Sequence, residues 1–273
     1  MADPGRSVSR RIFHRPEEEE MKRFRTAAVL LLCIIALAAP SPVRGESSLQ
    51  QNADALWAAR EDLAKAREAV AAHEALLKEN PGDFGTLLRL SRLHYWIGQK
   101  LETASRDEAL SQYGTGRDFG RKAAESSPKA PGGHFFEAAS MARENNLKGT
   151  FTNLWGISTV RRLNEKTAEL DPDFFYRGPD RFFCAMYTKL PGLFGGSASK
   201  AIEHGKRAVE AFPNYAGNRY FLAEAYFKDG RNDLARKELE AALAIPDDAL
   251  PDAVPEQRME KGRAAELLKK IGK

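Results

Sequence analysis

The sequence predicts an all-α protein, a right-handed superhelix of helical hairpins with long inter-helix connections and a C-terminal capping helix. Five prolines divide most of the chain at intervals of 47, 44, 41 and 33 residues, at Pro81, Pro128, Pro172, Pro213 and Pro246. A helical stretch with small residues precedes each proline, and an aromatic-rich helical stretch follows each of the first four. An interval of about 34 residues with this content is typical of a helix–turn–helix repeat array.

The unit that begins at Ala216 shows the repeat register most fully. Its seventh, eighth, eleventh, fifteenth, twentieth, twenty-fourth and twenty-seventh positions are Leu222, Ala223, Tyr226, Gly230, Ala235, Leu239 and Ala242. This is the tetratricopeptide pattern, in which small residues let two helices approach and large ones fill the space between units. A proline ends the second helix because it has no N–H to donate. Such an array presents a concave surface, so we expect a binding protein rather than an enzyme.

The first 45 residues are predicted to be removed before the protein functions. A basic start at 21–25 precedes an apolar run at 27–39, which is the arrangement of a signal peptide. The run is too short to span a bilayer comfortably, so we expect cleavage near Gly45 and a periplasmic mature protein. Cys33 lacks the small residue that a lipoprotein site needs just before it, and we expect no lipidation there.

We expect four segments along the chain. Residues 1–20 are predicted to be an extension upstream of the true start, and 21–45 to be the signal peptide. A disordered linker at 46–52 then leads into one tetratricopeptide-like helical repeat domain at 53–273.

Charge and cysteine content narrow the possible functions. The leader holds 8 of the 42 basic and 5 of the 38 acidic residues, which leaves 34 against 33 in the mature chain. This balance argues against nucleic acid as a partner. Only Cys184 remains after cleavage, so no internal disulfide can form, and apolar neighbours at Phe182, Phe183 and Met186 predict a buried thiol.

The units are expected to differ in the length of their connections. One long helix is predicted at 53–79, because Leu56, Leu63, Val70 and Leu77 recur every seven residues. In the first unit we expect helices at 84–98 and 113–127, with the extra residues between them at 99–112. We expect a second unit at 131–170 with a connection at 144–154, and a third unit from 173 with a connection at 189–197 and a helix at 199–211. A proline-rich break at 246–255 and an amphipathic capping helix at 256–271 are expected to follow the last regular unit. In the second unit Glu137 occupies a position that is normally apolar.

The sequence shows no catalytic, metal or cofactor motif. The mature histidines His73, His94, His134 and His204 lack the i, i+4 pairing of a helical zinc site. No serine lies in a Gly-x-Ser-x-Gly elbow. The glycines at 195–196 lack the Gly-Lys-Ser/Thr ending of a P-loop and predict a tight turn. We therefore expect no enzymatic activity and no cofactor.

Aromatic residues mark the expected binding groove. Of the 25 aromatic residues, 22 lie between Phe84 and Phe227. In tetratricopeptide arrays the first helix of each unit lines the groove, and its positions here include Arg92, Tyr95, Trp96, Phe135, Arg143, Tyr176, Phe183, Met186, Tyr187, Tyr220 and Phe227. Such a groove suits an extended peptide, a hydrophobic helix or an apolar small molecule. The same rings can instead pack between units, or the long N-terminal helix can fill the groove.

The stretch at 132–242 resembles the T-component of tripartite ATP-independent periplasmic (TRAP) transporters. The resemblance rests on Leu190-Pro191-Gly192-Leu193-Phe194-Gly195-Gly196-Ser197, on Lys200-Ala201, and on Lys206-Arg207-Ala208-Val209-Glu210-Ala211-Phe212-Pro213. It implies an envelope location, no enzymatic activity, a ligand channel between the helices and association with a TRAP solute-binding subunit. The alternative is a general tetratricopeptide scaffold for envelope protein assembly, with a peptide of another protein in the groove. The sequence leaves a homo-oligomer open.

Overall fold

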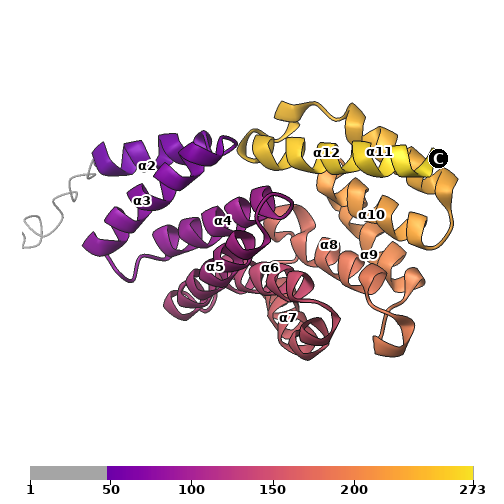
Figure 1. The fold of residues 1–273 in the computed structure, drawn as a ribbon, viewed down its shortest axis with the longest axis horizontal. Coiled ribbons are helices and arrows are strands. Elements are labelled where there is room, and N and C mark those ends of the chain that lie inside the picture. Colours follow the sequence, from indigo (N-terminus) through magenta and orange to yellow (C-terminus); the bar gives the residue numbers. More distant parts are fainter. Residues whose placement is uncertain (1–47, 273) are drawn as a thin grey trace, which may run out of the picture. The chain divides into compact units, whose positions relative to one another are not determined.

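The structure is a computed structural model that describes residues 48–272, without the side chains of 150–155. Within that range all regular elements are helices, and no strand occurs (Figure 1). The expected upstream extension and the expected signal peptide, with Cys33 and Gly45, lie outside the described residues.

The α-helices follow one another with few residues between them. They are α2 (Ser48–Ala58), α3 (Leu63–Glu79), α4 (Phe84–Leu101), α5 (Arg106–Ser126), α6 (Pro131–Lys148), α7 (Thr150–Leu170), α8 (Phe174–Lys189), α9 (Ala198–Ala211), α10 (Ala216–Lys228), α11 (Asn232–Ala244) and α12 (Val254–Ile271). Three short 3₁₀ turns are η1 (Gly192–Phe194), η2 (Asp247–Ala249) and η3 (Pro251–Ala253).

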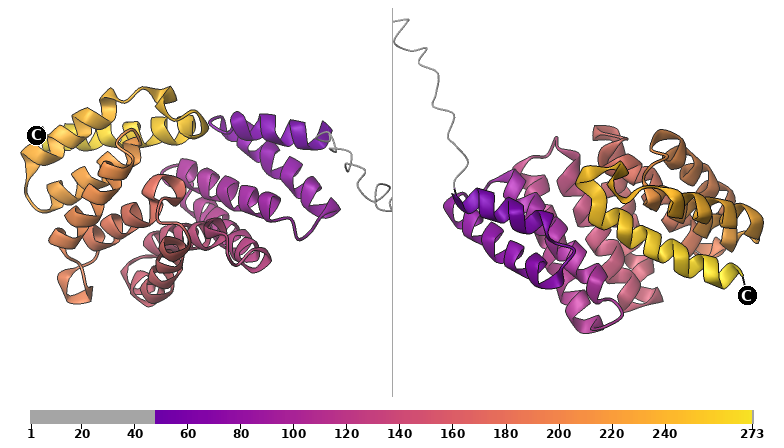
Figure 2. Two further views of the ribbon diagram at one scale, coloured as in Figure 1. Left: turned by 180° about the vertical axis from the view of Figure 1, so that it is seen from behind. Right: turned by 90° about the horizontal axis from the view of Figure 1, so that it is seen from above.

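Consecutive helices pack as hairpins. The hairpins are α4 with α5, α6 with α7, α8 with α9, and α10 with α11, and the contact of α5 with α6, which joins the first two hairpins, is as extensive as the contacts within them. The first helices of these hairpins also contact one another in order along the chain: α4 contacts α6, α6 contacts α8, and α8 contacts α10. The last helix, α12, contacts α10 (Figures 1 and 2). The expected all-α array of helical hairpins is confirmed.

Small residues lie where the helices cross. The alanines expected in the small positions are fully buried, namely Ala123, Ala138, Ala201, Ala208, Ala223, Ala235 and Ala242. The contact of α5 with α6 is closer still. A Cβ added to Gly133 would lie 2.3 Å from the backbone nitrogen of Ala124, and one added to Gly120 would lie 2.6 Å from that of Glu137. Only glycine allows this approach of two backbones.

Glu137 is buried, as expected for a position that is apolar in the repeat pattern. Its carboxylate accepts a hydrogen bond of 3.1 Å from Nε of Arg121 on α5. The charge is therefore paired across the hairpin, as a buried charge requires.

The N-terminal part differs from the expected linker and single helix. Residues 48–52 belong to α2, and the chain breaks between α2 and α3 instead of continuing as one helix to Glu79. Asp62 starts α3 by accepting hydrogen bonds from the backbone nitrogens of Ala64 and Lys65. The break also places Arg60 where its backbone carbonyl accepts a 2.7 Å hydrogen bond from the indole of Trp96.

The extra residues of the first two units lie mainly in longer helices. In the first unit α4 runs to Leu101 and α5 starts at Arg106, so most of the segment expected to connect them is helical. Leu101 and Ala109 are buried, which favours helix at both ends of that segment. In the second unit only Gly149 separates α6 from α7, and its φ of 104° favours glycine.

The third unit keeps a long connection. Residues 190–197 join α8 to α9 through η1, and Leu193 at its tip is 96 % exposed. Cys184 is buried as expected, in an apolar cluster that includes residues of α9 and α10. Burial raises the pKa of its thiol to about 12.

A buried carboxylate also joins α8 to α9. Asp180 accepts hydrogen bonds of 2.7 Å from His204 and 3.1 Å from Arg207, both on α9. Burial raises the pKa of Asp180, but these hydrogen bonds outweigh that effect and hold the pKa below its usual value.

The last helix packs back on the array. The side chain of Gln257 accepts from the backbone nitrogen of Ala216 and donates to the carbonyl of Asn214, each at 2.7 Å. It thereby caps the start of α10, and α12 acts as the expected capping helix. No helix in residues 48–272 is long and apolar enough to cross a membrane.

Candidate functional site

A cavity of about 180 Å³ lies on the inner side of the row of first helices. Its walls come from α4, α6 and α8, with additions from α7, Tyr215 and Phe221. The last helix, α12, contributes Glu256, Met259 and Glu260. The helix that completes the wall is thus α12. The N-terminal segment was considered as a filler of the groove, but its helix α3 packs against α4.

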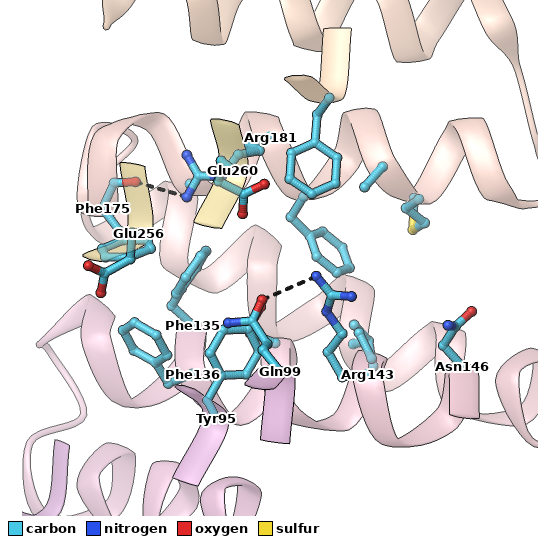
Figure 3. Close-up of a pocket in the computed structure, with 18 of the residues that line it drawn as sticks. Tyr95, Gln99, Phe135, Phe136, Arg143, Asn146, Phe175, Arg181, Glu256 and Glu260 are labelled. Atoms are coloured by element: carbon cyan, nitrogen blue, oxygen red, sulfur yellow. Dashed lines mark hydrogen bonds between the residues drawn. The ribbon is translucent and has the colours of Figure 1, made fainter. Parts of the chain in front are cut away.

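Aromatic rings form much of the wall. Figure 3 shows Tyr95, Phe135 and Phe136 beside one another, with Phe175 above them in this view. The rings of Phe135 and Phe136 lie 5.1 Å apart at 86°, and Phe136 lies 5.4 Å from Phe175. These edge-to-face pairs hold the rings in fixed directions, so they form a preformed apolar surface.

The polar part of the wall is mainly cationic. Arg143 on α6 approaches the side-chain oxygen of Gln99 at 3.4 Å (Figure 3). It approaches that of Glu102 at 3.4 Å as well, which is long for a charged pair. Burial lowers the pKa of Arg143, but interactions with Tyr95, Glu102 and Tyr113 outweigh it, and the pKa lies above its usual value. The guanidinium therefore stays charged inside the wall.

Lys189 adds a second cation near Arg143. It lines the cavity and makes no hydrogen bond or ion pair with another described residue. Burial lowers the pKa of its amine, Glu224 opposes that change, and Arg143 and Arg263 lower the pKa further. Its ammonium is therefore poorly compensated within the protein.

An unusual backbone turn places Arg181 at the other side of the cavity. Phe175, Tyr176 and Arg177 have φ of 51°, 58° and 63°, a left-handed conformation that is strained for side chains of this kind. The turn directs the carbonyls of Phe175 and Tyr176 at Arg181. Arg181 donates to Phe175 at 3.1 Å (Figure 3) and to Tyr176 at 3.0 Å. Asn218 accepts a third hydrogen bond from Arg181 at 2.8 Å. The strained turn is thus held by a buried arginine.

Part of the predicted groove set lines this cavity, namely Arg92, Tyr95, Trp96, Phe135, Arg143 and Met186. The other predicted residues lie outside its wall, namely Tyr176, Phe183, Tyr187, Tyr220 and Phe227.

Most of the residues outside the wall pack against other parts of the array, whereas Phe227 is exposed. Tyr176 stacks on Tyr215 at 4.9 Å. Phe183 and Tyr187 both contact the ring of His204 on α9, at 5.1 and 5.6 Å. Residue periodicity identifies first helices correctly here, but it does not show how far each helix is rotated toward the cavity.

Several lining residues were not predicted from the sequence. They are chiefly Gln99, Phe136, Phe175, Arg181, Lys189 and the α12 residues Glu256, Met259 and Glu260. Phe136 adjoins a predicted residue and shares its aromatic signal. The α12 residues carry no such signal, because their place in the wall depends on how the C-terminal helix packs.

The arrangement suits binding better than covalent chemistry. Within residues 48–272 no group of three histidine, cysteine or acidic residues could hold a metal ion. The cavity combines fixed aromatic rings with cations, of which Arg143 makes only long hydrogen bonds and Lys189 makes none through its side chain within the described residues. Such a site can hold an apolar molecule and orient a polar group on it.

Comparisons with known proteins agree on the fold. The profile of the TRAP transporter T-component family matches residues 134–272. The crystal structure of a thermophilic TPR protein from Thermus thermophilus superposes with a TM-score of 0.57 at 20% identity, over 79% of this chain and 98% of that one. At this identity the likeness shows a tetratricopeptide-like fold alone. No curated protein matches the sequence.

Proposed function

The chain belongs to the TRAP transporter T-component family, and we propose that it is a non-enzymatic binding protein accessory to TRAP-type solute uptake. The single observation that carries the proposal is the cavity between the first helices and α12, whose aromatic wall suits a small apolar ligand. Arg92, Tyr95, Trp96, Phe135, Arg143 and Met186 are the proposed binding residues from the predicted groove set.

The proposal includes the place of the protein in the cell and its partner. The basic start and apolar run at 21–39 support export to the periplasm, with cleavage near Gly45. Family membership supports association with a TRAP solute-binding subunit. The intact mass of the protein recovered from the envelope fraction tests the first point. A retained leader or a lipid on Cys33 would contradict it.

Two readouts on the mature chain test the function. The tagged protein is purified from the envelope fraction, captured proteins are identified by mass spectrometry, and a solvent extract is searched for small molecules. We expect a TRAP solute-binding subunit among the captured proteins and an apolar molecule in the extract. Absence of both would refute the proposal.

A matched pair of variants locates the ligand. Tyr95 and Tyr187 are both half-buried tyrosines on first helices, but only Tyr95 lines the cavity. Tyr95→Ala should lose the extracted molecule, and Tyr187→Ala should retain it. Loss in Tyr187→Ala alone would place the ligand outside the cavity. Capture of many unrelated envelope proteins through extended segments would favour the general scaffold instead.

A further inference from the structure

Arg92 is a cation on the cavity wall whose side chain has no hydrogen-bond acceptor among the described residues. It lines the cavity from α4, and its side chain is 20 % exposed. Its nearest carboxylate oxygen, on Glu256, is 3.6 Å away, whereas Arg60 holds the other oxygen of Glu256 at 2.5 Å. The guanidinium instead faces aromatic rings, at 5.4 Å from Phe136 and 5.3 Å from Phe175. Its five N–H groups are thus unused by the fold.

The lining charges do not balance. Four cations line the cavity, Arg92, Arg143, Arg181 and Lys189, against the two carboxylates Glu256 and Glu260. Each carboxylate already has an arginine from outside the lining, since Arg60 holds Glu256 and Arg263 holds Glu260 at 2.8 Å. Arg181 is satisfied by its three hydrogen bonds and Arg143 approaches Glu102, so Arg92 and Lys189 are the lining cations that receive the least compensation.

The titration of Arg92 agrees with this geometry. Burial lowers the pKa of its guanidinium to about 10, Glu256 opposes that effect, and Arg89 and Arg60 reinforce it. An arginine normally titrates above about 12, so the attraction of Glu256 does not outweigh the effects of burial and of the neighbouring arginines on Arg92.

We propose that the cavity binds an amphipathic carboxylate, whose carboxylate group pairs with Arg92 and whose apolar body lies along the aromatic wall. The inference rests on the proposed function and specifies the ligand class of the same site. The planar fork of arginine matches a carboxylate in two parallel hydrogen bonds. A doubly charged phosphate fits less well, because Glu256 lies 3.6 Å from Arg92 and would repel it more strongly.

The helix geometry gives the direction of the apolar body. Arg92, Tyr95, Trp96 and Gln99 line the cavity from one face of α4. At a rise of 1.5 Å per residue, Gln99 lies about 10 Å along the helix from Arg92. The apolar body therefore extends from Arg92 past Tyr95 toward the Gln99–Arg143 pair.

A competing ligand class must be separated by experiment. One carboxylate oxygen of Glu260 is buried without a hydrogen-bond partner in the described part of the chain. An ammonium ligand directed at Glu260 would reverse the head-group preference that we propose. A series of probes with one tail and different head groups distinguishes the two classes.

The test measures binding of octanoate, octanamide, octylammonium and octyl phosphate to the mature protein by isothermal titration calorimetry at neutral pH. We expect octanoate to bind at least tenfold more tightly than the other three. Arg92→Met should weaken octanoate about 10- to 100-fold, the usual range for a charged hydrogen bond, and leave octanamide nearly unchanged. The octanoate affinity of Arg92→Lys should lie between those of the unaltered protein and Arg92→Met, because lysine keeps the charge but cannot form two parallel hydrogen bonds with a carboxylate.

Arg89→Met is the matched control. Arg89 lies three residues earlier on α4 and packs 4.2 Å from the Trp57 ring that Arg92 also contacts, but it does not line the cavity. It should leave octanoate affinity unchanged. If Arg92→Met does not fold, the head-group series on the unaltered protein still decides the question.

Each other outcome overturns the inference. Equal binding of octanoate and octanamide refutes the role of the carboxylate and leaves the apolar binding protein of the proposed function intact. Preference for octylammonium assigns the head group to the glutamates, and preference for octyl phosphate shows the wrong anion class. If no probe binds, the inference fails, while capture of the solute-binding subunit still decides the proposed function separately.

Discussion

The close contact of α5 and α6 can be tested by adding a single methyl group. Gly133→Ala places a Cβ 2.3 Å from the backbone nitrogen of Ala124, where an ordinary contact is at least 3.4 Å. Because both sides are backbone, the helices must separate by roughly 1 Å. Overpacking of this kind costs about 1–3 kcal/mol, and the better helix propensity of alanine offsets about 0.5–1 kcal/mol of it. We therefore expect a net destabilisation of about 1–2 kcal/mol.

Gly114, on the partner helix α5, is the control. Gly114 lies inside that helix, and a Cβ there would meet nothing within 4 Å. Gly114→Ala should stabilise the protein by about 0.5–1 kcal/mol. For a domain of this size, 1 kcal/mol shifts Tm by roughly 2–4 °C, so the two variants should move Tm in opposite directions. Far-UV circular dichroism on heating measures both. A Gly133→Ala protein as stable as the parent would refute the close contact that positions Phe135 and Phe136.

Three further predictions concern single buried groups. Gln257→Ala removes both bonds of its amide and leaves the Ala216 N–H unsatisfied, which should cost about 2–4 kcal/mol in urea unfolding. Asp180→Asn should lower Tm at neutral pH, because the depressed pKa of this carboxyl stabilises the fold above its unfolded pKa of about 3.9. That difference should shrink as the pH falls below the unfolded pKa and through the lower folded pKa, and an unchanged gap would contradict the linkage. Cys184 should resist iodoacetamide at pH 8 in the native protein and react on unfolding, because its thiol is buried with a pKa of about 12.

The repeat register could be predicted because it depends on local side-chain size. Ala223, Ala235 and Ala242 are fully buried where the pattern requires small residues, and Leu222 and Leu239 are buried beside them. Each position records how closely two neighbouring helices approach. The same pattern holds for any chain that packs in such hairpins, so it identifies the fold without long-range information.

The helix boundaries depended on contacts that periodicity does not contain. The heptad of leucines and valine at 56–77 continues across the break between α2 and α3. That break is held by Arg60, whose guanidinium binds Glu256, 196 residues away in sequence. The segment at 99–112 reads as an insertion by repeat length, yet Leu101 and Ala109 find buried positions that extend both helices. Tertiary packing decided both cases.

The site could be predicted mainly where it follows the first helices of the first two units, and Met186 is the one predicted lining residue on α8. There the residues that share one face of α4 and α6 reach the cavity, from Arg92 to Arg143. On α8 the left-handed turn at 175–177 changes how the helix begins, and its support comes from Arg181 and Asn218. On α12 the lining residues lie in the most distant part of the sequence. Neither the turn of α8 nor the packing of α12 produces a pattern in the neighbouring sequence.

Two charged residues at helix-packing positions lead to opposite conclusions. Glu137 departs from the repeat pattern, but Arg121 pairs with it and the contact of α5 with α6 accounts for its place. Arg92 has no such account, since its carboxylate neighbour at 3.6 Å is already held by Arg60 and its partly buried guanidinium otherwise faces aromatic rings. Removing an incompletely paired cation from much of its water opposes folding. A residue that opposes folding and lines a cavity is better explained by what the cavity binds than by what the fold requires.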